Sequence, residues 1–414
     1  MKDFFKTVLA TIVGLLAFSF LLTFFFISFI GTLAALGETR PVVPASAVMT
    51  IDMSKIVLTE QTQQTDMLTL LQSEDMQIQT LGTYSAIRAI NAAASDPAIR
   101  YIYMKPDAVI GGMAQIEEFR KALENFRMSG KAVISYIENP TNGGFYLASV
   151  SDKIYMTPHD GATNMFNGIS TQLIFLKDIL DRLGVNMQLI RHGKYKSAGE
   201  MFIRSSASKE NLEQNTAMVT SMWKSWASEI AASREITEAE LNAMLDNLEL
   251  NFPTDWVEHG LVDELFTREE LQQQIADLYV AETYEDVKSI SLQDYATLKN
   301  TVNYKAKNKV AVIYAEGDIV DGSAKEGVAG DRFAGIIADV RKDTTVKAVV
   351  LRVNSPGGSV LASEKIKAEL DLLQERVPVI ASYGDYAASG GYWISANCDK
   401  IYSDATTLTG SIGV

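Results

Sequence analysis

A serine among small residues is the first feature of this sequence that could do chemistry. Ser389 follows two alanines and precedes Gly390 and Gly391, and the apolar run at 377–381 before it is typical of a buried strand. The apolar residues after the glycines predict that a helix begins near Ser389. A serine at a helix N-terminus faces unpaired N–H groups and the positive end of the helix dipole, which stabilise a nearby oxyanion. The pattern fits a nucleophile, and it also fits a helix cap with glycines for packing.

A glycine pair upstream of Ser389 favours the interpretation of this serine as a nucleophile. Residues 348–353 predict a strand, residues 354–358 (NSPGG) predict a turn, and an amphipathic helix follows. Gly357 and Gly358 therefore lie between strand and helix, where backbone N–H groups are open to a ligand. Sites in α/β sheets lie at the carboxyl ends of strands. The two strand–turn–helix units together predict an acyl-transfer site.

Composition narrows the chemistry. The chain has 414 residues and a net charge of -14, which argues against a nucleic-acid partner. Cys398 is its single cysteine, so a disulfide framework and a zinc–cysteine cluster are excluded, and no ligand spacing predicts a metal or cofactor. The histidines, His159, His192 and His259, all lie outside the half of the chain that holds Ser389. This disfavours a Ser-His-Asp triad and points to another base.

Two lysines are candidates for that base. They lie at 192–200 (HGKYKSAGE), where small residues crowd Lys196. A lysine among small and apolar groups loses hydration, so its pKa falls from about 10.4 toward the roughly 7–8 that a base needs at neutral pH. Lys194 is the more solvated candidate, but spacing does not choose between them, and two surface lysines would give the same pattern. Upstream, the pattern predicts a helix over 173–183 and a strand over 185–191.

The chain after the first 46 residues repeats itself. Four features of the first part recur later in the chain, each separated by nearly the same number of residues. They are DKIY at 152–155 and 399–402, NGGFY at 142–146 and SGGYW at 389–393, Asp96 and Asp343, and the glycine pairs at 111–112 and 357–358. We interpret them as two copies of one α/β module. The first copy has Asn142 where the second has Ser389. Because an amide is a poor nucleophile, the first copy must contribute something else.

The N-terminus predicts a membrane anchor. Residues 7–37 carry no charge. This stretch is longer than the roughly 20 residues that span a bilayer as a helix, and longer than the apolar core of a cleaved signal peptide. Lys2 and Lys6 place residues 1–6 in the cytoplasm by the positive-inside rule, and the rest of the chain outside it. The expected organisation is an anchor at 7–37, a linker at 38–46, a first copy supplying lysine at 47–286, a connector at 287–308, and a second copy supplying serine at 309–414.

Four motifs carry a resemblance to a known family. They are GKYKSA at 193–198, NSPGGS at 354–359, AASGGYW at 387–393 and TGSIG at 409–413. With the anchor, they resemble the signal peptide peptidase A family of membrane-anchored bacterial serine proteases, in its long, two-repeat type. The resemblance runs from the anchor to the last residue.

The resemblance implies tandem ClpP/crotonase-like modules and a Ser/Lys dyad protease. Ser389 matches the family nucleophile, Lys196 its general base and Ser411 the serine that orients the lysine. The backbone N–H groups of Gly358 and Gly390 match the oxyanion donors. The family forms a bowl-like tetramer and degrades remnant signal peptides, which are apolar. Such a protein would lie in the bacterial inner membrane, with its catalytic part in the periplasm.

One departure and three alternatives accompany this interpretation. The family continues beyond the TGSIG motif, so we expect this chain to be a fragment with a truncated second copy. A crotonase-type acyl-CoA enzyme would share the fold but leave the anchor, Ser389 and Lys196 unexplained. A non-catalytic anchored assembly module would not depend on Ser389. A related membrane protease with stomatin-like partners lacks the tandem repeat that places the lysine in the first copy.

Overall fold

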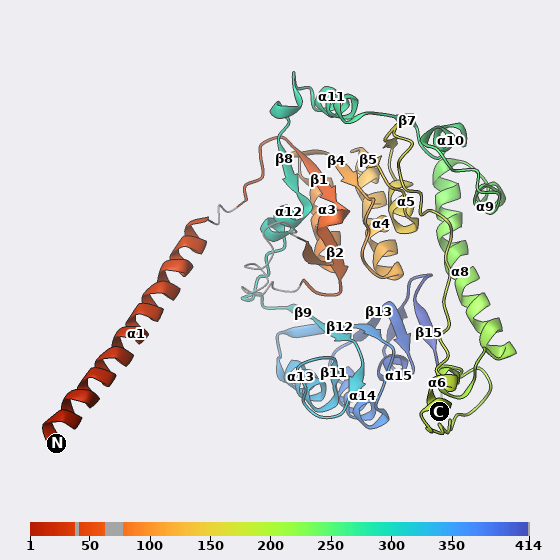
Figure 1. The fold of residues 1–414 in the computed structure, drawn as a ribbon. Coiled ribbons are helices and arrows are strands. Elements are labelled where there is room, and N and C mark those ends of the chain that lie inside the picture. The colour runs from red at the N-terminus through yellow and green to blue at the C-terminus, as the bar shows by residue number, and fades with distance from the viewer. Residues whose placement is uncertain (38–40, 63–77, 413–414) are drawn as a thin grey trace. The chain divides into compact units, whose positions relative to one another are not determined.

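The computed structural model describes residues 1–37, 41–62 and 78–412 (Figure 1). The chain divides into two units, Met1–Val42 and Val43–Val414, and each is considered by itself.

The first unit contains the helix α1, Lys2–Gly37. Its stretch Lys2–Ser28 has 27 residues and is apolar enough to cross a membrane. The predicted apolar helix is confirmed, and it begins at Lys2 rather than at Thr7. It fits a single-pass membrane anchor. Residues 38–40 of the predicted linker lie outside the described residues.

The second unit begins with a six-stranded parallel sheet, in the order β7-β6-β5-β4-β1-β8. Its strands are β1 Ala47–Asp52, β4 Ile99–Lys105, β5 Val133–Ile137, β6 Lys153–Met156, β7 Glu264–Leu265 and β8 Ser289–Ser291. All of β5 (VISYI) is buried, the pattern of a parallel strand covered on both faces. β2 Ile56–Thr59 and β3 Gln79–Gly82 form a separate pair, and the short helix η1 Met53–Lys55 precedes β2.

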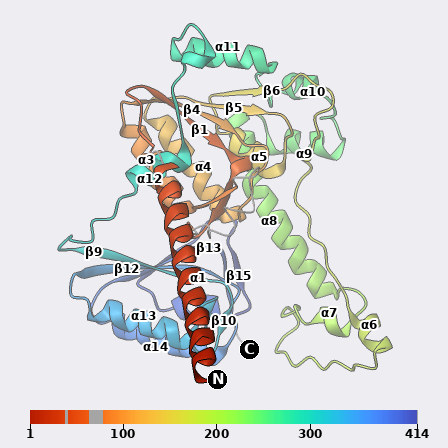
Figure 2. The same cartoon turned by 60° about the vertical axis from the view of Figure 1, so that its left-hand side comes forward.

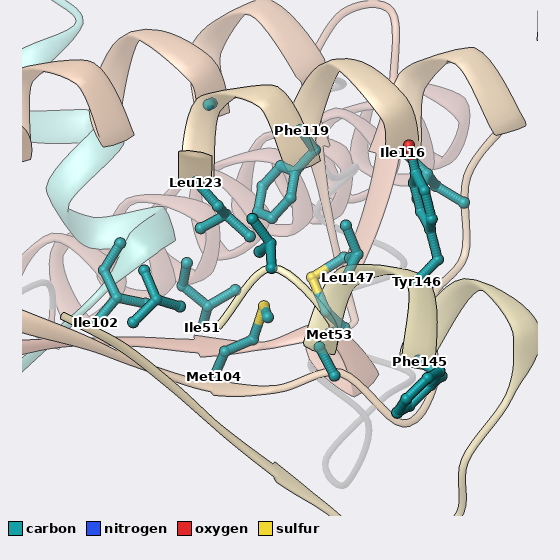
Figure 3. Packing of buried hydrophobic residues seen from close by; sticks show 14 of the residues in the cluster. Ile51, Met53, Ile102, Met104, Ile116, Phe119, Leu123, Phe145, Tyr146 and Leu147 are labelled. Carbon is teal, nitrogen blue, oxygen red and sulfur yellow. The ribbon is translucent and has the colours of Figure 1, made fainter. Parts of the chain in front are cut away.

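Helices cover this first sheet and continue beyond it. They are α3 Thr83–Ser95, α4 Met113–Met128, α5 Asn142–Ala148, α6 Lys177–Arg182, α7 Glu200–Ile203, α8 Lys209–Arg234, α9 Glu238–Asp246, α10 Pro253–Glu258, α11 Arg268–Tyr279, η2 Tyr284–Asp286 and α12 Leu292–Lys299. Figure 3 shows Phe119 and Leu123 of α4 pointing toward Ile51 and Met104 of the strands. Because one apolar face of α4 packs on the sheet, this layer forms the main core.

A second parallel sheet, in the order β14-β13-β12-β9, carries β15 beside β13. Its strands are β9 Lys309–Glu316, β12 Val346–Ser355, β13 Val379–Ala388, β14 Lys400–Tyr402 and β15 Leu408–Gly410. The small pair β10 Ile319–Val320 and β11 Val328–Ala329 lies near α13 Gly330–Lys342, α14 Val360–Gln374 and α15 Gly390–Ser395. α13 and α14 run side by side (Figure 2), and Ile366, Leu370 and Leu373 of α14 are buried as the amphipathic pattern predicts. The predicted α/β class is therefore confirmed.

The two sheets share one order of elements. The first runs β4, α4, β5, α5, β6, and the second runs β12, α14, β13, α15, β14. The predicted repeat requires this correspondence, and the repeat itself remains an interpretation.

The prediction of a strand over 185–191 is wrong. These residues form no strand, and α6 covers only Lys177–Arg182 of the helix predicted over 173–183. Ile190 is 96% exposed. Alternating apolar residues form a strand only where a neighbouring strand offers its edge, and this segment does not reach either sheet.

The connector predicted at 287–308 is partly structured. β8 within it pairs with β1, and Leu292 and Tyr295 of α12 are buried in the core of the first sheet. This part of the stretch belongs to the first sheet, because its apolar side chains complete that core. The remainder, after Lys299, leads irregularly to β9.

A buried arginine joins the two sheets. Arg352 of β12 donates from Nε to Glu60 at 2.7 Å and from Nη1 to Glu118 of α4 at 2.7 Å. Asp385 of β13 accepts the N–H of Ala114 in the first turn of α4 at 2.9 Å. Residues of the second sheet therefore pair with the carboxylates of Glu60 and Glu118 and accept a hydrogen bond from the N-terminus of α4. These polar contacts couple the second sheet to the part of the chain that contains the first sheet.

Replacing Arg352 is expected to destabilise the protein. Arg352→Ala would leave Glu60, which is 3% exposed, buried without its charged partner. Breaking a buried ion pair from one side costs about 3–5 kcal/mol in free energy of unfolding. Urea unfolding of the full-length protein in detergent measures this loss. The exposed Arg376→Ala is the control, and a loss for Arg352→Ala no larger than the control's would contradict the prediction.

Candidate active site

Ser389 lies at the sharp junction between β13 and α15. It is the N-cap of α15, with φ 49° and ψ -117°. A non-glycine residue rarely adopts this conformation, which costs on the order of 1–3 kcal/mol and persists where the surroundings impose it. Here the Ser389 N–H donates to the carbonyl of Gly410, and its carbonyl accepts from Trp393, both at 2.9 Å. A strained turn between strand and helix is the arrangement that exposes a nucleophilic serine in other hydrolases.

The glycine turn that follows β12 lies against this serine. A Cβ added to Gly357, whose φ is 100°, would lie 2.6 Å from the N of Gly390 and 2.8 Å from the Cβ of Ser389. Only glycine allows this approach. The turn is fixed by Ile319, whose N–H donates to Gly357 at 2.8 Å and whose carbonyl accepts from Ser359 at 2.8 Å.

Two backbone donors remain available at this junction. Over residues 41–62 and 78–412, the N–H groups of Gly358 and Gly390 donate no hydrogen bond. Gly358 is exposed and Gly390 half-buried, and the neighbouring Gly357 lies against Ser389 and Gly390. Donors already in place beside a nucleophile are what acyl transfer requires.

Lys196 lines a cleft next to the serine. The cleft has a volume of about 930 Å³, and Lys196, Ala388, Gly410 and Ser411 are among the residues that line it. Ala388 directly precedes Ser389, and Gly410 accepts its N–H. The structure therefore brings the lysine segment, the TGSIG segment and the serine junction to one place.

The two candidate lysines differ in their surroundings. The side chain of Lys194 is 79% exposed and pairs with Glu210 at 3.4 Å. Lys196 is half-buried on the cleft wall. The spacing left this choice open, and burial favours Lys196.

A histidine also reaches the cleft. His192 is exposed and lines it with the lysines. The sequence disfavoured a triad without excluding one, because no histidine lies in the half of the chain that holds Ser389. The fold brings residues 192–198 to the second sheet, so His192 must be compared with Lys196 by experiment.

Apolar side chains line much of the cleft. Those contributing are Leu173, Ile174, Phe175, Met201, Met218, Leu408 and Ile412. Such a wall binds apolar ligands by removing their surface from water.

Glu200 fixes the lysine segment, and the sequence did not reveal it. Its side chain is fully buried and accepts hydrogen bonds from Ser208, Asn211 and Arg191. Glutamate is rarely buried unless it is paired. The sequence offered one indication, because Ser208 is a residue type that caps helices and it precedes α8. Nothing in the spacing indicated that Ser208 would donate hydrogen bonds to the carboxylate of Glu200.

Glu200 should make stability depend on pH in acid. Burial raises the pKa of this carboxyl, but hydrogen bonds from Ser208, Asn211 and Arg191 outweigh burial and lower the pKa to about 2. Because the folded pKa lies below the ordinary value of 4.5, the stabilisation is fully present above that pH and is lost as the pH falls through about 2. We expect the unfolding free-energy difference between wild type and Glu200→Gln to shrink progressively in this window. Urea unfolding at several pH values measures it, and a constant difference down to the lower limit would contradict the assignment.

Comparison with known proteins defines the class. The model of the peptidase family S49 matches residues 125–281 and 371–414. The match to peptidase family S49 confirms the resemblance seen in the four motifs.

Particular relatives are similar over most of this chain. Protease 4 of Haemophilus influenzae is 35% identical over 346 residues, covering 81% of this chain and 56% of the relative. Protease 4 of Salmonella typhi is 36% identical over 348 residues, with the same shares. The chloroplastic serine protease SPPA of Arabidopsis thaliana is 31% identical over 336 residues, covering 78% and 48%. The chain thus spans about half the length of the curated relatives it matches.

A solved structure of a membrane-bound stomatin-specific protease also aligns with the chain. It is 13% identical, covers 62% of this chain and 100% of its own, and has a TM-score of 0.32.

Proposed function

We propose that this chain carries the active site of a membrane-anchored serine endopeptidase that uses a Ser/Lys dyad. The observation that carries the proposal is the junction at Ser389, where a strained serine meets a glycine turn with two available N–H groups. The adjoining cleft supplies Lys196. The match to peptidase family S49 and the similarity to relatives named as proteases support the same activity.

In the proposed mechanism Lys196 removes the proton of the Ser389 hydroxyl. The oxygen attacks a peptide carbonyl, and the N–H groups of Gly358 and Gly390 stabilise the resulting oxyanion. The tetrahedral intermediate expels the amine and leaves an acyl-enzyme, which water hydrolyses. Ser411, which lines the same cleft as Lys196, orients the lysine in this mechanism.

We propose apolar peptides, and remnant signal peptides in particular, as substrates. The apolar cleft supports the first part and the family resemblance the second. The same resemblance suggests a homotetramer. α1 would anchor the protein in the bacterial inner membrane, with residues 1–6 in the cytoplasm and the catalytic part in the periplasm, as Lys2 and Lys6 indicate.

Hydrolysis of an apolar peptide ester tests the proposal. The full-length natural protein in detergent is compared with Ser389→Ala and Lys196→Ala. Loss of turnover in both variants supports the dyad. Full activity of Ser389→Ala would show that the protease mechanism is wrong.

A further inference from the structure

One arginine holds the backbone of the proposed base. Arg191 donates from Nη1 to the carbonyl oxygen of Lys196 at 2.9 Å and from Nη2 to Oε1 of Glu200 at 3.1 Å. Its side chain is 24% exposed. A single planar guanidinium therefore bridges the two ends of the turn from Lys196 to Glu200.

The far end of this bridge is fixed to a long helix. The N–H of Ser208, the N-cap of the 26-residue helix α8, donates to Glu200 at 3.1 Å, and its hydroxyl donates at 2.7 Å. Asn211, in the first turn of α8, adds a bond at 3.2 Å. Glu200 is thus an immobile anchor, and Arg191 transmits its position to Lys196.

A second connection holds the next residue. The hydroxyl of the buried Ser197 donates to Asn211 at 3.2 Å, and Gln214 donates to the Ser197 hydroxyl. Since Lys196 and Ser197 are both attached to α8, the lysine Cα has a defined position on the cleft wall.

Position matters more for a base than for a binding contact. A displacement of about 1 Å at a reacting group can lower the rate about 10²-fold. An arginine fork makes two hydrogen bonds in a fixed plane, which an ammonium group does not reproduce.

We propose that Arg191 is a positioning residue for the general base Lys196, acting through the Lys196 carbonyl with Glu200 as its fixed support. This inference rests on the proposed dyad mechanism. Arg191 does not touch the substrate in this scheme, so its loss lowers kcat and leaves KM nearly unchanged.

The test uses the full-length protein in detergent with an apolar peptide ester. Arg191→Ala is expected to lower kcat about ten- to a hundredfold, with KM within about twofold of wild type. Methylguanidinium, at concentrations that do not unfold the protein, should restore part of kcat by occupying the vacated site. Arg204→Ala is the matched control, because Arg204 is exposed in the same segment and its side chain donates to the carbonyl of Ser206 rather than to Lys196 or Glu200.

Arg191→Lys keeps the inference testable if Arg191→Ala does not fold. It retains the charge beside Glu200 but loses the fork, so kcat should fall and KM should not change. Wild-type kcat in Arg191→Lys, a change in KM alone, or no methylguanidinium rescue of a folded Arg191→Ala would each overturn the positioning role.

The assay separates this role from the proposed function. If Ser389→Ala is inactive while both Arg191 variants match wild type, the positioning role alone is wrong. If Ser389→Ala is fully active, the protease mechanism is wrong, and the positioning role fails with it.

Discussion

Ser389→Ala is expected to lower kcat/KM for an apolar peptide ester by a factor on the order of 10⁴ or more. The hydroxyl is the only atom that forms the covalent intermediate in the proposed mechanism, and removal of a serine nucleophile has effects of this size in other hydrolases. Alanine keeps the Cβ, so the close contact with the turn at Gly357 is retained. Ester hydrolysis and labelling by a fluorophosphonate should be lost together.

Ser389→Gly separates catalysis from strain. Glycine adopts a φ of 49° and a ψ of -117° at little cost, whereas serine and alanine do not. We expect the glycine variant to be inactive but more stable than the alanine variant by about 1 kcal/mol or more. Urea unfolding of both variants measures this difference. Equal stabilities would show that the junction is unstrained.

Lys196→Ala is expected to lower kcat/KM by a factor comparable to that of Ser389→Ala. The proposed base and the nucleophile act as a unit, and such groups are strongly non-additive, so the double variant should be little worse than either single one. Lys194→Ala should stay within about threefold of wild type, because that side chain is 79% exposed and pairs with Glu210.

Two further variants make the assignment of the base specific. Lys196→Arg keeps a positive charge but cannot be deprotonated, so it should be as inactive as the alanine variant. His192→Ala removes the histidine that also lines the cleft. If His192→Ala were inactive and Lys196→Ala active, the Ser/Lys mechanism would have to be replaced by one that uses histidine.

Much of the site was readable from local sequence. The strand before Ser389, the glycine turn at 357–358 and the amphipathic face of α14 depend on backbone preferences and periodicity over short windows. These are local properties, so α14 was found with its buried face correctly placed. The anchor was equally clear, because bilayer thickness sets a length that a single helix must satisfy.

Other features depend on residues far apart in the chain. The apolar alternation at 185–191 predicted a strand, but no sheet edge reaches it. β8 and α12 looked like connector, yet β8 pairs with β1 and α12 completes the core of the first sheet. Pairing partners and buried faces are decided by the packing of distant segments, which no local pattern contains.

The chemistry of the site also depends partly on local sequence and partly on contacts between distant residues. The types and neighbours of Ser389, Lys196 and the glycine pair were enough to suggest acyl transfer, because a nucleophile, a base and backbone donors can be recognised individually. The position of Lys196 in a cleft beside the Ser389 junction, the burial that distinguishes Lys196 from Lys194, and the support of Lys196 by Arg191 and Glu200 follow from the folded chain. Burial and hydrogen-bond geometry are properties of three-dimensional neighbours, and the order of residues does not specify them.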